Sequence, residues 1–158
     1  MPNSYTKLYL HLIFAPKGRF SIHSKEHRVA ILNYISGIIT NHKSHLIIGS
    51  VMPDHVHLLI ALHPTLSVSE IAQKVKSNSS KHINEQTWLP GKFSWSDGYG
   101  GFTVSQSKLD VVKQYIENQE EHHKKHKFYD EMKEFFAAHN IITDKEEGCW
   151  ADKQEQEV

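Results

Sequence analysis

The sequence predicts one α+β domain with a ferredoxin-like antiparallel sheet and helices on one of its faces. Strand-like and helix-like segments follow one another in the order strand, helix, strand, strand, helix, strand, helix. The chain of 158 residues has the length of one domain and can bury a core of its own. No apolar run approaches the roughly 18 residues of a membrane-spanning helix, so no membrane segment is expected. The domain is expected over residues 1–143, followed by a charged, disordered tail over residues 144–158.

The first predicted elements are a strand over residues 5–14 and a helix over residues 24–41. In the strand, Leu10 and Leu12 alternate with His11, which is the period of an extended chain with one apolar face. In the helix, apolar side chains recur at helical spacing, and a serine at its first position can cap it. The chain therefore opens with a strand that has one core face, followed by an amphipathic helix.

The next predicted elements are two strands, over residues 46–51 and 55–62. The turn between them, at residues 52–54, contains a proline, which presets the backbone for turning. Two short apolar strands joined by a tight turn predict a β-hairpin. Since helices need to cover only one face of the sheet, the other face is available as an open floor for a site.

Capping signals mark the helices of the second half of the chain. Ser67 and Glu70 have the spacing of a capping box, and Ser107 and Asp110 repeat it. Between these helices the chain is rich in glycine and aromatic residues, as expected of a loop. The predicted elements are a helix over residues 67–85, a loop over 88–101, a strand over 102–105, a helix over 107–125 and a short helix over 129–139.

The sequence His55-Val-His57 is the strongest local signal for chemistry. In a strand, side chains two residues apart point the same way, so both imidazoles leave one face while Val56 enters the core. Two adjacent imidazoles can chelate one divalent cation. The alternative is a pair of exposed surface histidines, which is common in a chain with 13 histidines. Asp54 is either a turn residue or a hydrogen-bonding partner that orients a histidine.

Tyr115 and Gln119 form the second signal, because residues four apart lie on one ridge of a helix. The alternative for Tyr115 is an ordinary residue at the border of an amphipathic helix. A phenol has a pKa near 10 and is a poor nucleophile at neutral pH, so it needs help from its surroundings. A metal held by two imidazoles would have open positions, and the amide oxygen of Gln119 could fill one of them. Such a ligand set does not settle which metal is bound.

Four segments in order carry a family resemblance. Met52-Pro-Asp-His-Val-His-Leu-Leu59 resembles the HUH motif of the single-tyrosine transposases, in which U is a hydrophobic residue. Residues 10–19, with the sequence LHLIFAPKGR, resemble the first strand and loop of that family, and residues 95–102, WSDGYGGF, resemble its glycine-aromatic segment. The spacing of Tyr115 and Gln119 resembles its nucleophile helix. The family includes transposases of the insertion sequence 200/605 group and REP-associated tyrosine transposases, and the resemblance runs from about Tyr5 to Lys125.

The resemblance implies a ferredoxin-like, RRM-like fold with a C-terminal helix that carries the nucleophile. It implies that His55, His57 and Gln119 bind Mg²⁺ or Mn²⁺. Tyr115 would attack a DNA phosphodiester, which gives a 5′-phosphotyrosine link and a free 3′-hydroxyl that can later rejoin strands. The family works on single-stranded DNA with a foldback hairpin near the element end, and as a homodimer. His122 and His123 follow Gln119 and either reach the metal or phosphate or end the helix in solvent.

The charge of the chain is a weak guide to its partners. The formal net charge is zero with histidines neutral, which is unusual for a DNA-binding protein. Acidic residues gather in the tail, and the rest of the chain is somewhat basic. For the lysines of the second helix, a solvated helix face is the alternative to phosphate binding. The candidate DNA contacts are Lys17, Arg19, Lys76, Lys81 and Trp95, the last by stacking on unpaired bases.

Two other classes of function compete with the transposase. One is a non-catalytic or domesticated single-stranded nucleic-acid binding protein on the same fold, which would need stacking aromatics where this strand offers His55 and His57. The other is an unrelated metal-dependent hydrolase, for which Tyr115 would be dispensable. The expected location is the cytoplasm, because the N-terminus has no secretory signal and Cys149 has no partner for an internal disulfide.

Overall fold

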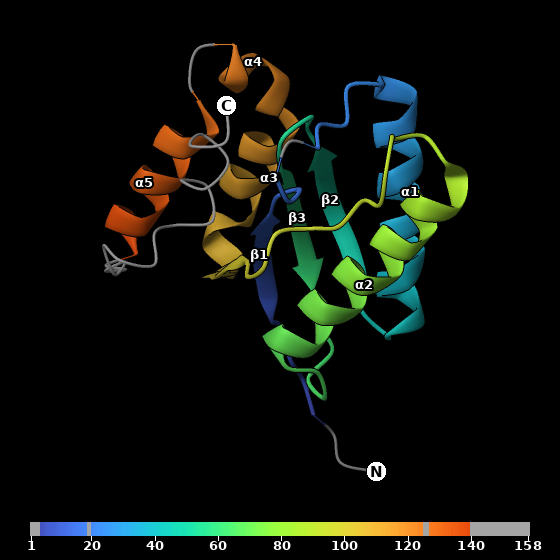
Figure 1. Ribbon diagram of the computed structural model, residues 1–158. Coiled ribbons are helices and arrows are strands. Elements are labelled where there is room, and N and C mark those ends of the chain that lie inside the picture. The colour runs from blue at the N-terminus through green and yellow to red at the C-terminus, as the bar shows by residue number, and fades with distance from the viewer. Residues whose placement is uncertain (1–3, 19, 125–126, 140–158) are drawn as a thin grey trace.

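The computed structural model describes residues 4–18, 20–124 and 127–139 and shows an α+β fold. Four strands form one sheet in the order β2-β3-β1-β4, and every neighbouring pair is antiparallel (Figure 1). This order separates β1 from β2 by β3, as in the predicted ferredoxin-like arrangement. The strands are β1 (Tyr9–Phe14), β2 (His45–Val51), β3 (Val56–Ala61) and β4 (Gly100–Val104).

Helices α1 (Lys25–Asn41) and α2 (Val68–Gln86) cover one face of the sheet. Both begin at the predicted caps: Ser24 accepts from the backbone N–H of His27 at 3.3 Å, and Ser67 accepts from Glu70 at 3.1 Å. The alternation predicted for the first and third strands is confirmed, since their apolar side chains point into the core between sheet and helices. That core includes Leu12, Phe14, Val56, Leu58, Ile60, Ile35, Ile39, Ile71 and Val75.

The sequence predicts that the other face of the sheet is open, and this prediction was wrong. Three helices cover it, and Figure 1 shows them on the side of the sheet away from α1 and α2. They are α3 (Leu109–Glu117), α4 (Gln119–His123) and α5 (Phe128–Ala138). A smaller apolar cluster joins α5 to this face through Ile13 of β1, Ala15, Phe102 of β4, Phe128 and Met132.

The prediction of one helix over residues 107–125 was wrong. A 3₁₀ turn, η1 (Gln106–Lys108), precedes α3, and the chain breaks again at Asn118 before α4 begins. Ser107 caps neither helix, because its hydroxyl lies 3.1 Å from that of Ser105 instead. The consequence is that Tyr115 and Gln119 belong to different short helices, and α4 can turn toward the sheet.

Some sequence predictions fall outside the described residues, namely the tail over residues 144–158 and Arg19. The last predicted helix, over residues 129–139, corresponds to α5. Within residues 4–18, 20–124 and 127–139, no helix is both long and apolar enough to cross a membrane.

Candidate active site

The histidine pair lies where β3 begins, at the end of a tight turn. The backbone N–H of Met52 donates to the carbonyl of His55 at 2.8 Å and closes the turn that the proline predicts. His57 lies opposite Ile13 in the ladder between β3 and β1, so its ring points to the face covered by α3, α4 and α5. The rings of His55 and His57 are 5.0 Å apart and nearly perpendicular, and both residues are fully buried.

Glu131 of α5 lies against the histidine pair. Glu131 places one carboxylate oxygen 3.1 Å from Nε2 of His57 and the other 4.0 Å from Nε2 of His55. The second oxygen also lies 2.7 Å from Nε2 of His123, at the end of α4. Four side chains from three parts of the chain therefore converge, and one ligand atom from each lies within 4.8 Å of the others.

Gln119, which the sequence predicts to be a metal ligand, is buried at the same place. Its side-chain nitrogen donates to the carbonyl of Tyr115 at 3.2 Å and lies 3.5 Å from a Glu131 oxygen, so its oxygen faces the histidines. That oxygen is 3.2 Å from Nε2 of His55. The break at Asn118 makes this possible, because it lets the first residue of α4 point inward.

Two residues outside this cluster orient its imidazoles. The Nδ1–H of His55 donates to a carboxylate oxygen of Asp54 at 2.7 Å, which leaves the lone pair of Nε2 pointing into the cluster. His57 Nδ1 and His11 Nε2 share a hydrogen bond of 2.8 Å, and His11 is itself buried. In both histidines of the pair, a hydrogen bond at Nδ1 orients the ring so that Nε2 points into the cluster, which is the arrangement of metal-binding histidines.

The charges of the site respond to its burial. Burial raises the pKa of Glu131 to about 8, and repulsion from Asp54 and Glu134 adds to this effect. Burial, reinforced by positive charge on His55 and His11, lowers the pKa of His57 well below 6.5. Burial also lowers the pKa of His11 to about 4. At Asp54, burial acts to raise the pKa, but the hydrogen bond and positive charge of His55 outweigh it and lower the pKa.

These residues fit a divalent cation. Nε2 of His55 and the amide oxygen of Gln119 lie 3.2 Å apart, and a neutral His55 that donates Nδ1–H to Asp54 presents its Nε2 lone pair beside that oxygen, as two ligands of one ion would. His57 Nε2 and Glu131 Oε2 are buried and make no hydrogen bond of regular geometry among the described residues, although each has a polar atom within 3.1 Å. One ligand atom from each of His55, His57, His123 and Glu131 lies within 4.8 Å of the others, close enough to share one ion. Imidazole, carboxylate and amide oxygen are ligands of divalent transition metals.

Tyr115 lies beside this cluster in the same chain. Its ring centroid is 5.6 Å from that of His57 and 6.3 Å from that of His11, both in edge-to-face geometry. Phe135 of α5 packs against it at 5.6 Å. The phenol oxygen is buried, and no described residue hydrogen-bonds to it. A buried hydroxyl without a partner is costly to stability, which makes Tyr115 a candidate for a functional role.

The structure separates the candidate DNA contacts from this site. Lys76 donates to the carbonyls of Ser96 and Gly98, both at 2.7 Å, and so holds the glycine-aromatic loop onto α2. Trp95 is buried, with its indole N–H donated to Ser79 at 2.9 Å. In this placement Trp95 is withdrawn from solvent, and the half-buried Lys76 is engaged by two carbonyls, so their role in binding stays a prediction.

The other described candidates for DNA contacts are two exposed lysines, Lys81 and Lys17. Lys81 lies on α2, on the side of the sheet away from the histidines, where it lines a cleft of about 500 Å³ together with Lys92. Lys17 follows β1, at the sheet end where β3 begins and His55 lies, since Phe14 pairs with Val56. Of the two exposed lysines, Lys17 is therefore the one at the end of the sheet that carries the site.

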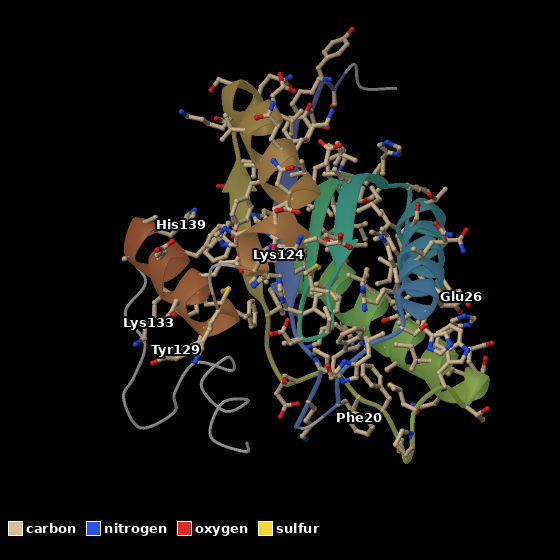
Figure 2. The ribbon with its side chains drawn as sticks, turned by 90° about the horizontal axis from the view of Figure 1, so that it is seen from above. Phe20, Glu26, Lys124, Tyr129, Lys133 and His139 are labelled. Atoms are coloured by element: carbon tan, nitrogen blue, oxygen red, sulfur yellow. The ribbon has the colours of Figure 1, made fainter. Side chains whose placement is uncertain are left out.

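Sequence reasoning missed Glu131 and left His123 open. The signal for Glu131 is its place in α5, where Phe128, Met132 and Phe135 form an apolar stripe that faces the sheet. A carboxylate within such a stripe is either paired or ligating when it is buried. Figure 2 labels Tyr129 and Lys133 of α5, and His139 directly after it, on the opposite side of the sheet from Glu26 of α1.

The fold and the site define an α+β protein with a buried histidine-rich cluster, fit for a metal, beside a tyrosine. A family model for IS200-like transposases matches residues 4–119, and the chain belongs to this family. The match ends at Gln119, so His123 and Glu131 lie beyond the matched residues.

Several relatives agree with this assignment. The ISDra2 transposase TnpA of Deinococcus radiodurans is 28% identical over 120 residues, covering 72% of this chain and 84% of the relative. The transposase for insertion sequence element IS200 of Salmonella typhimurium is 29% identical over 119 residues, covering 72% and 78%.

Two solved structures share the fold. A structure described as a transposase from Deinococcus radiodurans R1 has a TM-score of 0.61 at 29% identity, covering 75% of this chain and 95% of that one. A REP-associated tyrosine transposase bound to a REP hairpin has a TM-score of 0.59 at 13% identity, covering 78% and 73%. At that identity the second likeness concerns the fold alone.

Proposed function

We propose that this protein is a DNA transposase that cleaves and rejoins single-stranded DNA through a 5′-phosphotyrosine intermediate, with Tyr115 as the nucleophile. The observation that carries the proposal is the buried phenol of Tyr115, which has no described hydrogen-bond partner and whose ring lies 5.6 Å from that of His57. The family supplies DNA transposition as the context. A nucleophile beside a cluster of potential metal ligands is what such chemistry requires.

In this proposal His55, His57 and Gln119 hold a divalent ion, Mg²⁺ or Mn²⁺. When bound, the ion polarises the scissile phosphate and offsets negative charge on its oxygens. Asp54 and His11 fix the two imidazoles with Nε2 toward the ion, through hydrogen bonds of 2.7 Å and 2.8 Å. The resting pKa of His57, well below 6.5, keeps its ring neutral and able to act as a ligand near neutral pH.

The reaction proceeds by two transesterifications. In the first, the phenol oxygen of Tyr115 loses its proton and bonds to phosphorus, the bond from phosphorus to the 3′ oxygen breaks, and that oxygen takes up a proton. The product is a 5′-phosphotyrosine and a free 3′-hydroxyl. In the second, a 3′-hydroxyl attacks the phosphotyrosine, a DNA phosphodiester forms, and Tyr115 regains its proton. The phosphodiester energy is conserved in the protein link, so no ATP is needed.

The proposed substrate is single-stranded DNA with hairpin ends, in the cytoplasm. The hairpin is proposed from the family resemblance; a protein of the same fold has been solved bound to a REP hairpin. A homodimer is proposed from the family resemblance, although one chain already brings Tyr115 to its own histidines.

The test uses oligonucleotides from the ends of the protein's own genetic element, labelled at either the 5′ or the 3′ end, with Mn²⁺ or Mg²⁺. Wild type is expected to form a covalent adduct with the fragment on the 3′ side of the cut, through its 5′ phosphate, so that the 3′-labelled oligonucleotide shifts on a denaturing gel. Tyr115→Phe and His57→Ala should both abolish it, while Tyr34→Phe, on the far side of the molecule, should not. Cleavage that survives Tyr115→Phe without an adduct would instead indicate a metal-dependent hydrolase. Binding without cleavage under either metal would indicate a non-catalytic or domesticated binding protein.

A further inference from the structure

The proposed active site is closed in this structure. His55, His57 and Gln119 are each 0% exposed, and Glu131 is 2% exposed, so a DNA phosphate cannot reach them in this arrangement. The cover is α5, which packs on the sheet through Phe128 and Met132. Because Glu131 and His123 lie beyond the residues matched by the family, this cover is not accounted for by the family assignment.

We propose that Glu131 and His123 are further metal ligands that latch α4 and α5 over the histidine pair, and that the scissile phosphate gains the ion by replacing Glu131. The inference rests on the proposed function, since it concerns the same ion. It changes the expected metal in the closed state. Two imidazoles with an amide oxygen leave the metal open, whereas three imidazoles with a carboxylate favour Zn²⁺, Co²⁺ or Mn²⁺ over Mg²⁺, which prefers oxygen ligands and keeps its waters.

The carboxylate geometry supports ligation. One Glu131 carboxylate faces three imidazole nitrogens at once, at 2.7 Å from His123, 3.1 Å from His57 and 4.0 Å from His55. A structural ion pair would direct each N–H at an oxygen, yet Glu131 Oε2 and His57 Nε2 have no hydrogen bond of regular geometry among the described residues. A carboxylate buried in the apolar face of α5 is costly unless it keeps a proton or a cation compensates it.

Displacement by phosphate follows from the chemistry of the exchanged groups. A carboxylate oxygen and a phosphate oxygen are both hard, anionic ligands, so replacing one by the other keeps the ligand type and the charge balance of the site. His55, His57 and Gln119 come from the sheet and α4 and can stay in place while α5 moves.

The packing of α5 allows this movement. Its buried apolar residues are Phe128 and Met132, joined by the partly buried Phe135 and Phe136, whereas α1 and α2 are anchored in a much larger core. Elements with few buried apolar contacts open at the lowest free-energy cost. Metal ligation by Glu131 would therefore add materially to what holds α5 down.

The first test measures metal binding by the full chain without DNA, after treatment with EDTA. Co²⁺, with its visible absorption, and Mn²⁺ are titrated into wild type, Glu131→Gln and a matched control on the same helix, Glu134→Gln, whose side chain is exposed. We expect Glu131→Gln to lose at least about tenfold in affinity for both ions and to change the Co²⁺ spectrum, while Glu134→Gln matches wild type. His123→Gln should give a similar loss, which protects the conclusion if one variant folds poorly by circular dichroism. Equal affinity and an identical spectrum in wild type and Glu131→Gln would overturn the inference.

The second test follows α5 by hydrogen exchange in the Mn²⁺-loaded protein. Adding the single-stranded oligonucleotide should raise exchange in α5 of wild type, because phosphate takes the place of Glu131. Unchanged exchange in α5 while the DNA is cleaved would refute the displacement. The proposed function can fail separately: wild type would then show the Glu131-dependent metal affinity but form no adduct through Tyr115.

Discussion

Glu131→Gln should make the stability of the metal-free protein less sensitive to pH. Burial, with repulsion from Asp54 and Glu134, raises the pKa of Glu131 from 4.5 to about 8. The folded protein therefore keeps a proton that the unfolded chain has released. A group of this kind contributes stability that is complete below pH 4.5 and is lost as the pH rises through about 8.

The window from pH 6.5 to 8 contains part of this loss. Burial lowers the pKa of His57 well below 6.5 and that of His11 to about 4, so each of them still adds about 0.4 kcal/mol of stability over the window, as the unfolded histidine loses its proton. Over the window, a carboxyl with pKa values of about 8 folded and 4.5 unfolded costs about 1.6 kcal/mol of stability. One proton limits the slope to about 1.4 kcal/mol per pH unit. For a domain of this length the loss corresponds to roughly 3–6 °C in Tm.

Urea denaturation in EDTA, at several pH values across this window, measures the difference. Wild type should lose stability as pH rises, while Glu131→Gln, which cannot ionise, should gain slightly because the contributions of His57 and His11 remain. Glu134→Gln should follow wild type with only a small offset, because Glu134 is the weakest of the causes that raise the pKa. Parallel curves for wild type and Glu131→Gln would refute the reasoning, since Glu131 would then be ionised in the folded state throughout. Adding Mn²⁺ should reverse the trend in wild type, because metal binding releases the proton.

Three further outcomes are expected. Ser79→Ala should cost about 1–3 kcal/mol in urea denaturation, because it leaves the buried indole N–H of Trp95 without its acceptor; the exposed Ser77→Ala should cost little, and equal losses would contradict this. Ser67→Ala should cost about 1 kcal/mol by removing the cap of α2, and no change in Tm would contradict it. A mixture of Tyr115→Phe and His57→Ala chains should form no DNA adduct, because Tyr115 lies beside the histidines of its own chain. Recovery of the adduct in that mixture would indicate that tyrosines are exchanged between subunits.

The sequence predicts the local parts of this structure well, because they depend on local rules. Alternation in β1 and β3 places Leu12 and Leu58 in the core and His11 and His57 on the other face, whatever the rest of the chain does. The caps of α1 and α2 and the turn before β3 are also local, and all are confirmed. The histidine pair could be predicted for the same reason.

The helical cover was harder to predict because its geometry depends on distant partners. Residues 107–125 contain neither glycine nor proline, so nothing in this segment signals a break at Asn118. The break places Gln119 in contact with His55, which lies 64 positions earlier in the sequence, and this contact favours the break. Likewise, Trp95 looks like a stacking residue until the structure pairs it with Ser79 and packs it edge-to-face on Phe14 and Phe93.

The sequence of α5 makes Glu131 unusual, but it does not reveal which residues Glu131 contacts. In isolation, a glutamate among Phe128, Met132 and Phe135 only weakens the apolar face of a helix. Its meaning appears when the opposing surface is known to carry His55 and His57, because a carboxylate and two imidazoles facing one another in a dry interface are stable together when a cation lies between them. Burial that is costly for each group alone becomes favourable for the set. A metal that binds the folded chain would therefore raise its stability and hold α5 closed until a DNA phosphate replaces Glu131.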